Sequence, residues 1–160
     1  MENKIDKLTY LMKLNSNIYR CSQAYIDKHL AKYNLSMSSY PYLLVLKRCS
    51  GISQNDISKE LNVDKSMSAR TIKKLIEEGY IRKEQNKEDI RAYQLYLTDK
   101  AREIIPEILT IVQDWIDIIV PETMYSDAHL IENGLSFLEQ VLTNGKKYRH
   151  YCSEHTKGDE

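Results

Sequence analysis

The chain has 160 residues, and its 23 lysines and arginines are balanced by 23 aspartates and glutamates, so the formal net charge is zero. With 5 glycines and 3 prolines it is not a low-complexity chain, and no apolar run approaches the roughly 20 residues that span a bilayer. Its N-terminus lacks a signal-like apolar core, and three widely spaced cysteines do not form a disulfide framework. We therefore expect a cytoplasmic protein, without membrane contact, that folds as one domain over residues 1–145.

The first part of the chain has the periodicity of helices. Apolar residues recur every three or four positions from residue 5 to residue 33, without glycine or proline, which predicts one long amphipathic helix. Because a small domain cannot cover such a length, a partner subunit is its natural cover. Serines at 36–39 and Pro41 predict the start of a second helix that stops near Gly51.

Two short helices follow. Ser53 with an acid, Asp56, three residues later indicates one helix start, and Asp64 can cap a second helix that ends at Gly79. Two short helices joined by a tight turn are typical of a helix-turn-helix.

From residue 80 the apolar residues alternate. This pattern predicts two antiparallel strands, at 80–84 and 92–97, with Leu95 and Leu97 on one face. The polar stretch between them predicts a charged hairpin tip at 85–91.

Helical spacing returns after the second strand. A long helix is expected from Asp99 to Pro121, and a last helix from Ser126 to Gly145, with residues 146–160 as a flexible tail. The predicted fold class is mainly α with a small β-hairpin wing, and the winged helix-turn-helix occupies about residues 36–98.

A basic helix face is the first candidate functional surface. Residues 65–74 contain four basic residues and no acid. With Ile72 pointing inward, the opposite face carries five candidate DNA-binding side chains: Ser66, Met67, Arg70, Lys73 and Lys74. An α-helix fits the major groove, where Arg70 can reach guanine O6 and N7 while lysines contact phosphates. A merely solvated charged face is the alternative interpretation.

The hairpin tip is the second candidate surface. Arg91 would project from the wing, and an arginine at such a tip suits the narrow, negative minor groove. Asp89 can orient this guanidinium by a charge-assisted hydrogen bond. An ordinary charged hairpin is the alternative here.

These segments together resemble the MarR family of bacterial regulators. The resemblance rests on the run from Leu61 to Arg70, on Asp89-x-Arg91 in the wing, and on the Leu-x-Leu-Thr that ends at Thr98. It implies a homodimeric winged-helix regulator whose dimerisation helices lie at about 4–33 and 99–143. Ser68 departs from the family, because an aliphatic residue is usual at this inward position.

The resemblance also suggests that a small molecule or an oxidant controls the protein. Relatives bind ligands near the first two helices, where four tyrosines offer apolar walls with polar tips to a phenolic or aromatic effector: Tyr25, Tyr33, Tyr40 and Tyr42. Packing at helix seams is the alternative for these rings.

Cysteines and histidines give a second possible chemistry. Cys21 and Cys49 fit buried, small apolar positions. In the tail, His150, Cys152 and His155 have ligand-type side chains but lack a second pair for a structural zinc site, so we assign neither metal nor cofactor.

We therefore expect a sequence-specific DNA-binding regulator that acts as a repressor, binds a near-palindromic operator on double-stranded DNA as a homodimer, and is released by a small-molecule effector. Two alternatives remain: a cysteine-based redox-sensing regulator of the same fold, and a winged-helix protein-interaction module that does not bind DNA. An enzyme is not expected, since the chain has no glycine-rich phosphate loop, Gly-x-Ser-x-Gly or His-Glu-x-x-His motif.

Overall fold

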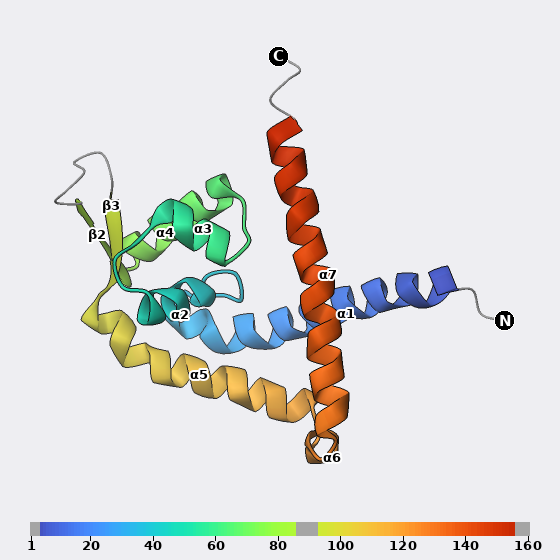
Figure 1. Ribbon diagram of the computed structural model, residues 1–160. Helices are drawn as coiled ribbons and strands as arrows, with labels where there is room; N and C mark the ends of the chain where they lie inside the picture. Colours follow the sequence, from blue (N-terminus) through green and yellow to red (C-terminus); the bar gives the residue numbers. More distant parts are fainter. Residues whose placement is uncertain (1–3, 86–92, 156–160) are drawn as a thin grey trace. The chain divides into compact units, whose positions relative to one another are not determined.

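The computed structural model describes residues 4–85 and 93–155 (Figure 1). The chain divides into two compact units, Met1–Trp115 and Ile116–Glu160, which are treated separately. The elements, in chain order, are α1 (Lys4–Leu30), the 3-10 helix η1 (Ala31–Tyr33), α2 (Tyr40–Arg48), β1 (Ile52–Ser53), α3 (Gln54–Glu60), α4 (Lys65–Glu77), β2 (Ile81–Gln85), β3 (Tyr93–Leu97), α5 (Asp99–Ile119), α6 (Glu122–Tyr125) and α7 (Ala128–His155). The predicted fold class, mainly α with a small hairpin wing, is confirmed.

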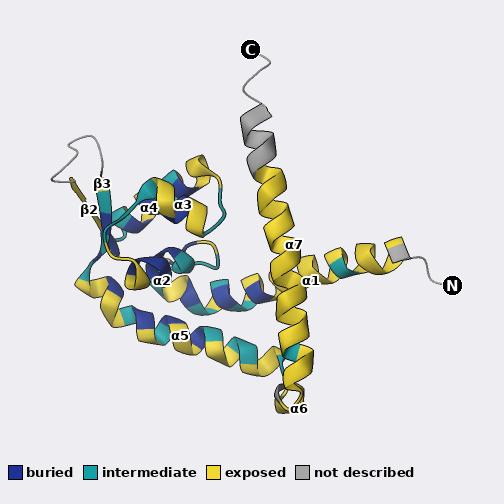
Figure 2. Cartoon of the chain, in the orientation of Figure 1, coloured by how far each residue is buried: buried dark blue, intermediate teal, exposed yellow. Residues whose placement is uncertain are grey.

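The C-terminal part of α1 packs into the core of the first unit, whereas its N-terminal half is exposed (Figure 2). Ile26 and Leu30 are buried. The expected single helix over 5–33 ends at Leu30 and continues as the 3-10 turn η1, after which Asn34 adopts a left-handed conformation with φ 56°. That conformation, which asparagine tolerates, stops the helix and turns the chain toward α2.

The two helices of the turn motif start where the sequence predicts. Ser53 Oγ accepts a hydrogen bond from the Asp56 amide at 3.2 Å at the start of α3. Asp64 Oδ1 accepts the amides of Ser66 at 2.7 Å and Met67 at 3.2 Å at the start of α4. Both predicted caps are confirmed, and they satisfy amides that would otherwise lack an intrahelical partner.

A small antiparallel sheet forms the wing, with strand order β1-β3-β2. Leu95 and Leu97 of β3 are buried, as the alternating pattern predicted. The short strand β1 was not predicted; its Ile52 pairs with Leu95. Gly51, immediately before it, has a φ of +81°, and an added Cβ would lie 3.2 Å from the hydroxyl of Tyr96.

Helix α5 runs beside the C-terminal part of α1 in the opposite direction (Figure 1). Its inward residues are Ala101, Ile105, Ile108 and Ile111. Near residue 115 the indole of Trp115 donates a hydrogen bond to Ser22 Oγ at 2.8 Å, and its ring stacks on Tyr25 with centroids 5.0 Å apart. These contacts fix the direction in which α5 leaves the core.

The second unit consists of the end of α5 with α6 and α7. The start of α7 is confirmed, since Asp127 Oδ1 accepts the Leu130 amide at 3.0 Å. Its expected end is wrong: the helix does not stop at Asn144–Gly145 but continues to His155, so residues 146–155 are helical rather than a loose tail. A glycine inside a helix costs only about 1 kcal/mol relative to alanine, which the flanking helix formers can offset.

The exposure of two cysteines corrects another expectation. Cys21 and Cys49 were expected to be buried, and both are exposed in the single chain. Cys21 lies where α1 leaves the core, and Cys49 follows the last residue of α2, outside its apolar face.

Among the described helices, none combines the length and hydropathy needed to cross a bilayer.

Candidate nucleic-acid interface

The outward face of α4 carries the residues that the helical wheel selected. All five are exposed: Ser66, Met67, Arg70, Lys73 and Lys74. Met67 is the large apolar side chain of this face and keeps 51% of its surface accessible. An apolar group left outside in this way can contact a thymine methyl in the major groove.

The opposite face of α4 anchors the helix. Ile72 and Leu75 are buried to 2% and 1% exposure, and each contributes about 1.5–3 kcal/mol through burial of its side chain. Ser68, expected to point inward, is fully buried, and its hydroxyl has no hydrogen-bond partner among the described residues. The helix is therefore held by its apolar residues and its Asp64 cap, which leaves the basic face without a structural role inside the chain.

The charges of this face are available to a partner. Lys73 approaches Glu77 at 3.8 Å, but both side chains are exposed, and an exposed pair of this kind contributes little. Within the part of the chain that the structure describes, Arg70 makes only a long hydrogen bond, 3.4 Å from Nε to the Ser66 carbonyl. The prediction omitted Lys65, which is also exposed at the start of α4; its place in the acid-free run 65–74 was the signal.

The wing adds further cations. Its tip lies outside the described residues, so the predicted contacts of Asp89 and Arg91 stay predictions. Strand β2 exposes Arg82 and Lys83, which the prediction missed although they directly follow the buried position at the strand start.

Each of these wing cations is attached to β3. Arg82 lies over the ring of Tyr96 at 4.7 Å, and Lys83 lies over the ring of Tyr93 at 4.0 Å. Such cation–π contacts orient both cationic side chains along the strand pair.

The base of the wing is fastened to the end of α4. Thr98 Oγ1 donates to the carbonyl of Gly79 at 2.7 Å, and Lys100 Nζ donates to the carbonyl of Glu78 at 2.6 Å. Tyr80 is buried, which raises the pKa of its hydroxyl, and this hydroxyl donates to the carbonyl of Tyr33 at 2.8 Å. Because these bonds hold the hairpin against the helix, the two basic surfaces keep a fixed relation.

The four tyrosines proposed for an effector occupy different environments. Tyr25 stacks between His29 and Trp115, with centroids 4.1 and 5.0 Å away. Tyr40 is partly buried, which raises the pKa of its hydroxyl. Tyr42 is 1% exposed and its hydroxyl has no partner.

Tyr33 is engaged with α5. Its hydroxyl donates to one oxygen of Glu107, while Lys32 Nζ donates to the other oxygen at 2.5 Å. The hydrogen bond from Lys32, followed by that from Tyr33, holds the pKa of the Glu107 carboxyl below its usual value. The effector role of all four tyrosines stays a prediction.

Within residues 4–85 and 93–155, no cluster of three or more His, Cys, Asp or Glu side chains could hold a metal ion. The side chains of His150, Cys152 and His155 lie outside the described set.

Comparison with known proteins identifies the family to which this winged helix-turn-helix belongs. The profile of a family described as transcriptional regulator SarA/Rot matches residues 24–108. The HTH-type transcriptional regulator BilQ of Clostridioides difficile (strain CD3) is 36% identical over 138 residues, which cover 86% of this chain and 91% of that protein. A MarR transcriptional regulator from Methanosarcina mazei Go1 is similar to this chain in structure, with a TM-score of 0.75, 33% identity, and coverage of 88% of this chain and 99% of that one. The chain belongs to the MarR family of winged-helix transcriptional regulators.

The match to the family profile includes α4 and β2, which carry the exposed cations described above. The profile match runs from the buried end of α1 through the helix-turn-helix and wing to Ile108 of α5. The fold is also shared with a mutant MarR from E. coli complexed with operator DNA, with a TM-score of 0.73, 16% identity, and coverage of 88% of this chain and 99% of that one.

Proposed function

We propose that this regulator reads DNA with the outward face of α4. The observation that carries the proposal is the exposed face that displays Arg70, Lys73 and Lys74 together with Met67, on a helix whose other face is buried. Arg70 would form the base contact, because a guanidinium can pair with guanine O6 and N7 by two hydrogen bonds. The two lysines would contact phosphates, which supply affinity without sequence information.

The wing would bind beside this helix in the minor groove. Arg82 and Lys83 support this role through their exposure on β2, and Arg91 with Asp89 at the tip would extend it. Since the protein has no net charge, general attraction to DNA would be weak, and affinity would depend on these few contacts.

We further infer that the protein acts as a homodimer. Apolar side chains exposed on α1 and α7 support this inference: Ile5, Leu8, Met12, Ile18, Leu130, Leu135, Phe137, Leu138 and Leu142. A monomer rarely leaves so many apolar side chains in water along two helices. Two recognition helices about 34–36 Å apart would read a near-palindromic operator.

We further propose that the protein acts as a repressor. A dimer bound across a promoter represses transcription by occupancy alone, and a small molecule that prefers the unbound form releases it. The protein would work in the cytoplasm, without enzymatic activity of its own.

A second candidate is a redox-sensing regulator of the same fold. The exposure of Cys21 and Cys49 in the single chain favours it, because an oxidant needs access to a thiol. Loss of DNA binding on peroxide treatment, absent in the Cys21→Ser and Cys49→Ser variants, would select this candidate over the small-molecule effector.

The test of the main proposal is selection of DNA from a random-sequence library, followed by footprinting on the selected site. The proposal expects two half-sites about one helical turn apart and a complex that contains two chains. Retention of all sequences alike would instead indicate non-specific binding, and retention of none would favour the protein-interaction module.

A further inference from the structure

The chain enters and leaves its winged part, residues 40–97, through two segments that lie next to each other. It enters after η1, which continues directly from α1, and it leaves into the first turns of α5. Glu107 of α5 accepts hydrogen bonds from both Lys32 and Tyr33 of η1, and these two bonds are called the Glu107 tie. One carboxylate therefore joins the two connections between the winged part and the helices α1 and α5.

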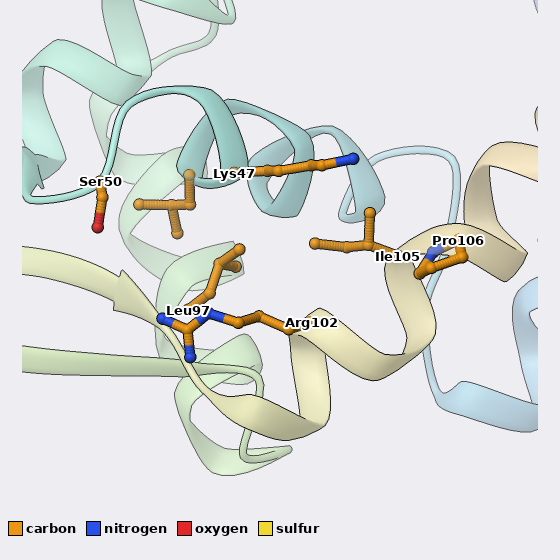
Figure 3. A pocket seen from close by; sticks show the side chains of 7 residues that line it. Lys47, Ser50, Leu97, Arg102, Ile105 and Pro106 are labelled. Carbon is orange, nitrogen blue, oxygen red and sulfur yellow. The ribbon is translucent and has the colours of Figure 1, made fainter.

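Helix α5 is weakened immediately before this tie. Pro106 has no amide hydrogen, so the helical hydrogen bond from position 106 to the carbonyl of Arg102 is missing, and α5 bends more easily here. Lys47, Ser50, Arg102 and Pro106 border a hollow of about 390 Å³ between the end of α2 and α5 (Figure 3). The helix therefore has room to bend beside the proline.

The two sides of Pro106 belong to different parts of the first unit. Before it, Lys100 Nζ donates to the carbonyl of Glu78 at the end of α4, at 2.6 Å. Beyond it, the indole of Trp115 donates to Ser22 Oγ of α1 at 2.8 Å. Of the contacts that hold α5 to its neighbours, the Glu107 tie lies nearest to the proline, so it is best placed to set the bend.

The other end of the tie is fixed to the recognition helix and the wing. The Tyr80 hydroxyl donates to the carbonyl of Tyr33 at 2.8 Å, and Asn34 Nδ2 donates to Glu78 Oε2 at 3.1 Å. Tyr33 thus contacts the base of the wing through its carbonyl and α5 through its hydroxyl. A continuous path of hydrogen bonds leads from the end of α4 through η1 to α5.

We propose that Glu107 is a positioning residue, which sets the direction of α4 relative to α1 and to the part of α5 beyond Pro106. In a homodimer this direction fixes the separation of the two α4 helices. Glu107 would therefore determine which spacing of operator half-sites the protein accepts. This inference rests on the proposed function, because half-site spacing matters only to a dimer that reads DNA.

The exposure of the tie indicates that its role is position rather than stability. The side chains of Lys32 and Glu107 are 60% and 44% exposed, and an exposed pair adds little to the free energy of unfolding. Loss of the tie should therefore leave a folded protein whose two α4 helices vary more in separation.

The first test compares DNA affinities for the selected operator and for versions with one base pair added or removed between the half-sites. Each base pair moves a half-site by about 3.4 Å and turns it by about 35°. Tyr33→Phe and Lys32→Met should each lower the ratio of affinities between selected and altered spacings roughly threefold, because an exposed charge-assisted bond is a modest restraint. The matched control, Lys28→Met, neutralises an exposed lysine of α1 outside the tie and should keep the native ratio.

Charge exchange provides the rescue. Lys32→Glu should lower the ratio as well, and adding Glu107→Lys should restore it, since the reversed pair can form and the new lysine can donate to the Tyr33 hydroxyl. A merely structural role would lower the thermal midpoint and weaken binding to all spacings alike. An unchanged ratio in Tyr33→Phe and Lys32→Met, or no recovery in the exchanged pair, would overturn the proposal.

A measurement without DNA separates this proposal from the proposed function. Spin labels at Glu77→Cys of α4 and Asp114→Cys of α5, in the full chain with its native cysteines replaced by serine and diluted with unlabelled protein, report the distance between the two helices by electron–electron double resonance. Tyr33→Phe should broaden the distance distribution. An unchanged distribution in a protein that binds its operator refutes the role of Glu107 alone, whereas a broadened one in a protein that ignores DNA refutes the proposed function alone.

Discussion

Ser68 provides a test of how α4, the proposed recognition helix, is held in the fold. Its side chain is fully buried and its hydroxyl has no hydrogen-bond partner. Ser58 of α3 is a matched comparison, because it is 3% exposed and its hydroxyl donates to the Gln54 carbonyl at 2.7 Å. Both residues lie within helices, so replacement by alanine brings the same gain in helix propensity, about 0.5 kcal/mol.

The effects of the two substitutions on the free energy of unfolding should therefore differ because one hydroxyl is hydrogen-bonded and the other is not. An unsatisfied buried polar group lowers the stability of the folded state by about 1–3 kcal/mol. Ser68→Ala removes this cost, although it also removes the few packing contacts that the oxygen makes. We expect Ser68→Ala to raise the free energy of unfolding by about 1–2 kcal/mol. Ser58→Ala should change it little or lower it by about 0.5–1 kcal/mol, because a satisfied hydrogen bond is lost.

Urea denaturation at one fixed protein concentration measures both values, and the fixed concentration keeps the contribution from dimer dissociation the same in the proteins compared. The thermal midpoint of Ser68→Ala should rise by roughly 2–8 °C for a chain of this size. If Ser68→Ala were no more stable than Ser58→Ala, the hydroxyl of Ser68 would have a partner and the reasoning would fail.

Three further variants test the phosphate contacts, the wing turn and the contact between η1 and α5. Lys74→Ala should weaken binding to all DNA sequences alike and reduce the slope of log K against log salt by about 0.9 for each of the two bound chains, whereas Lys28→Ala leaves the slope unchanged. Gly51→Ala should lower the free energy of unfolding by about 1–2 kcal/mol in thermal melts, because the left-handed backbone there strains any residue with a Cβ. The Glu107 carboxyl has a lowered pKa in the folded state, owing first to the hydrogen bond from Lys32, so it stabilises the protein above the pKa of the unfolded carboxyl. That stability is lost as the pH falls through the folded pKa, and the urea midpoint should decline less steeply below about pH 4.5 in Glu107→Gln than in the native chain.

Local signals in the sequence were enough to predict the elements that form the proposed DNA-binding face. The caps at Ser53 and Asp64 act within three residues, so their partners are visible in the sequence itself. The outward face of α4 followed from helical spacing, because one buried residue, Ile72, sets the direction of all the others.

Features that depend on distant contacts were not visible. The strand β1 contains only two residues and exists because Ile52 pairs with Leu95, far along the chain. The contact of Tyr33 with Glu107 joins residues separated by 74 positions. The exposure of Cys21 likewise depends on how far α1 extends past its own core, which apolar spacing alone does not reveal.

The central claim is that α4 reads the operator through Arg70. The measurement is the affinity of Arg70→Ala for the selected operator and for operators with single base-pair changes, compared at moderate salt with Lys28→Ala, which removes the same charge elsewhere. We predict that Arg70→Ala loses about 1–3 kcal/mol of operator affinity for each half-site, with relaxed preference at one base pair of each half-site. An affinity and a sequence preference equal to those of Lys28→Ala would contradict it.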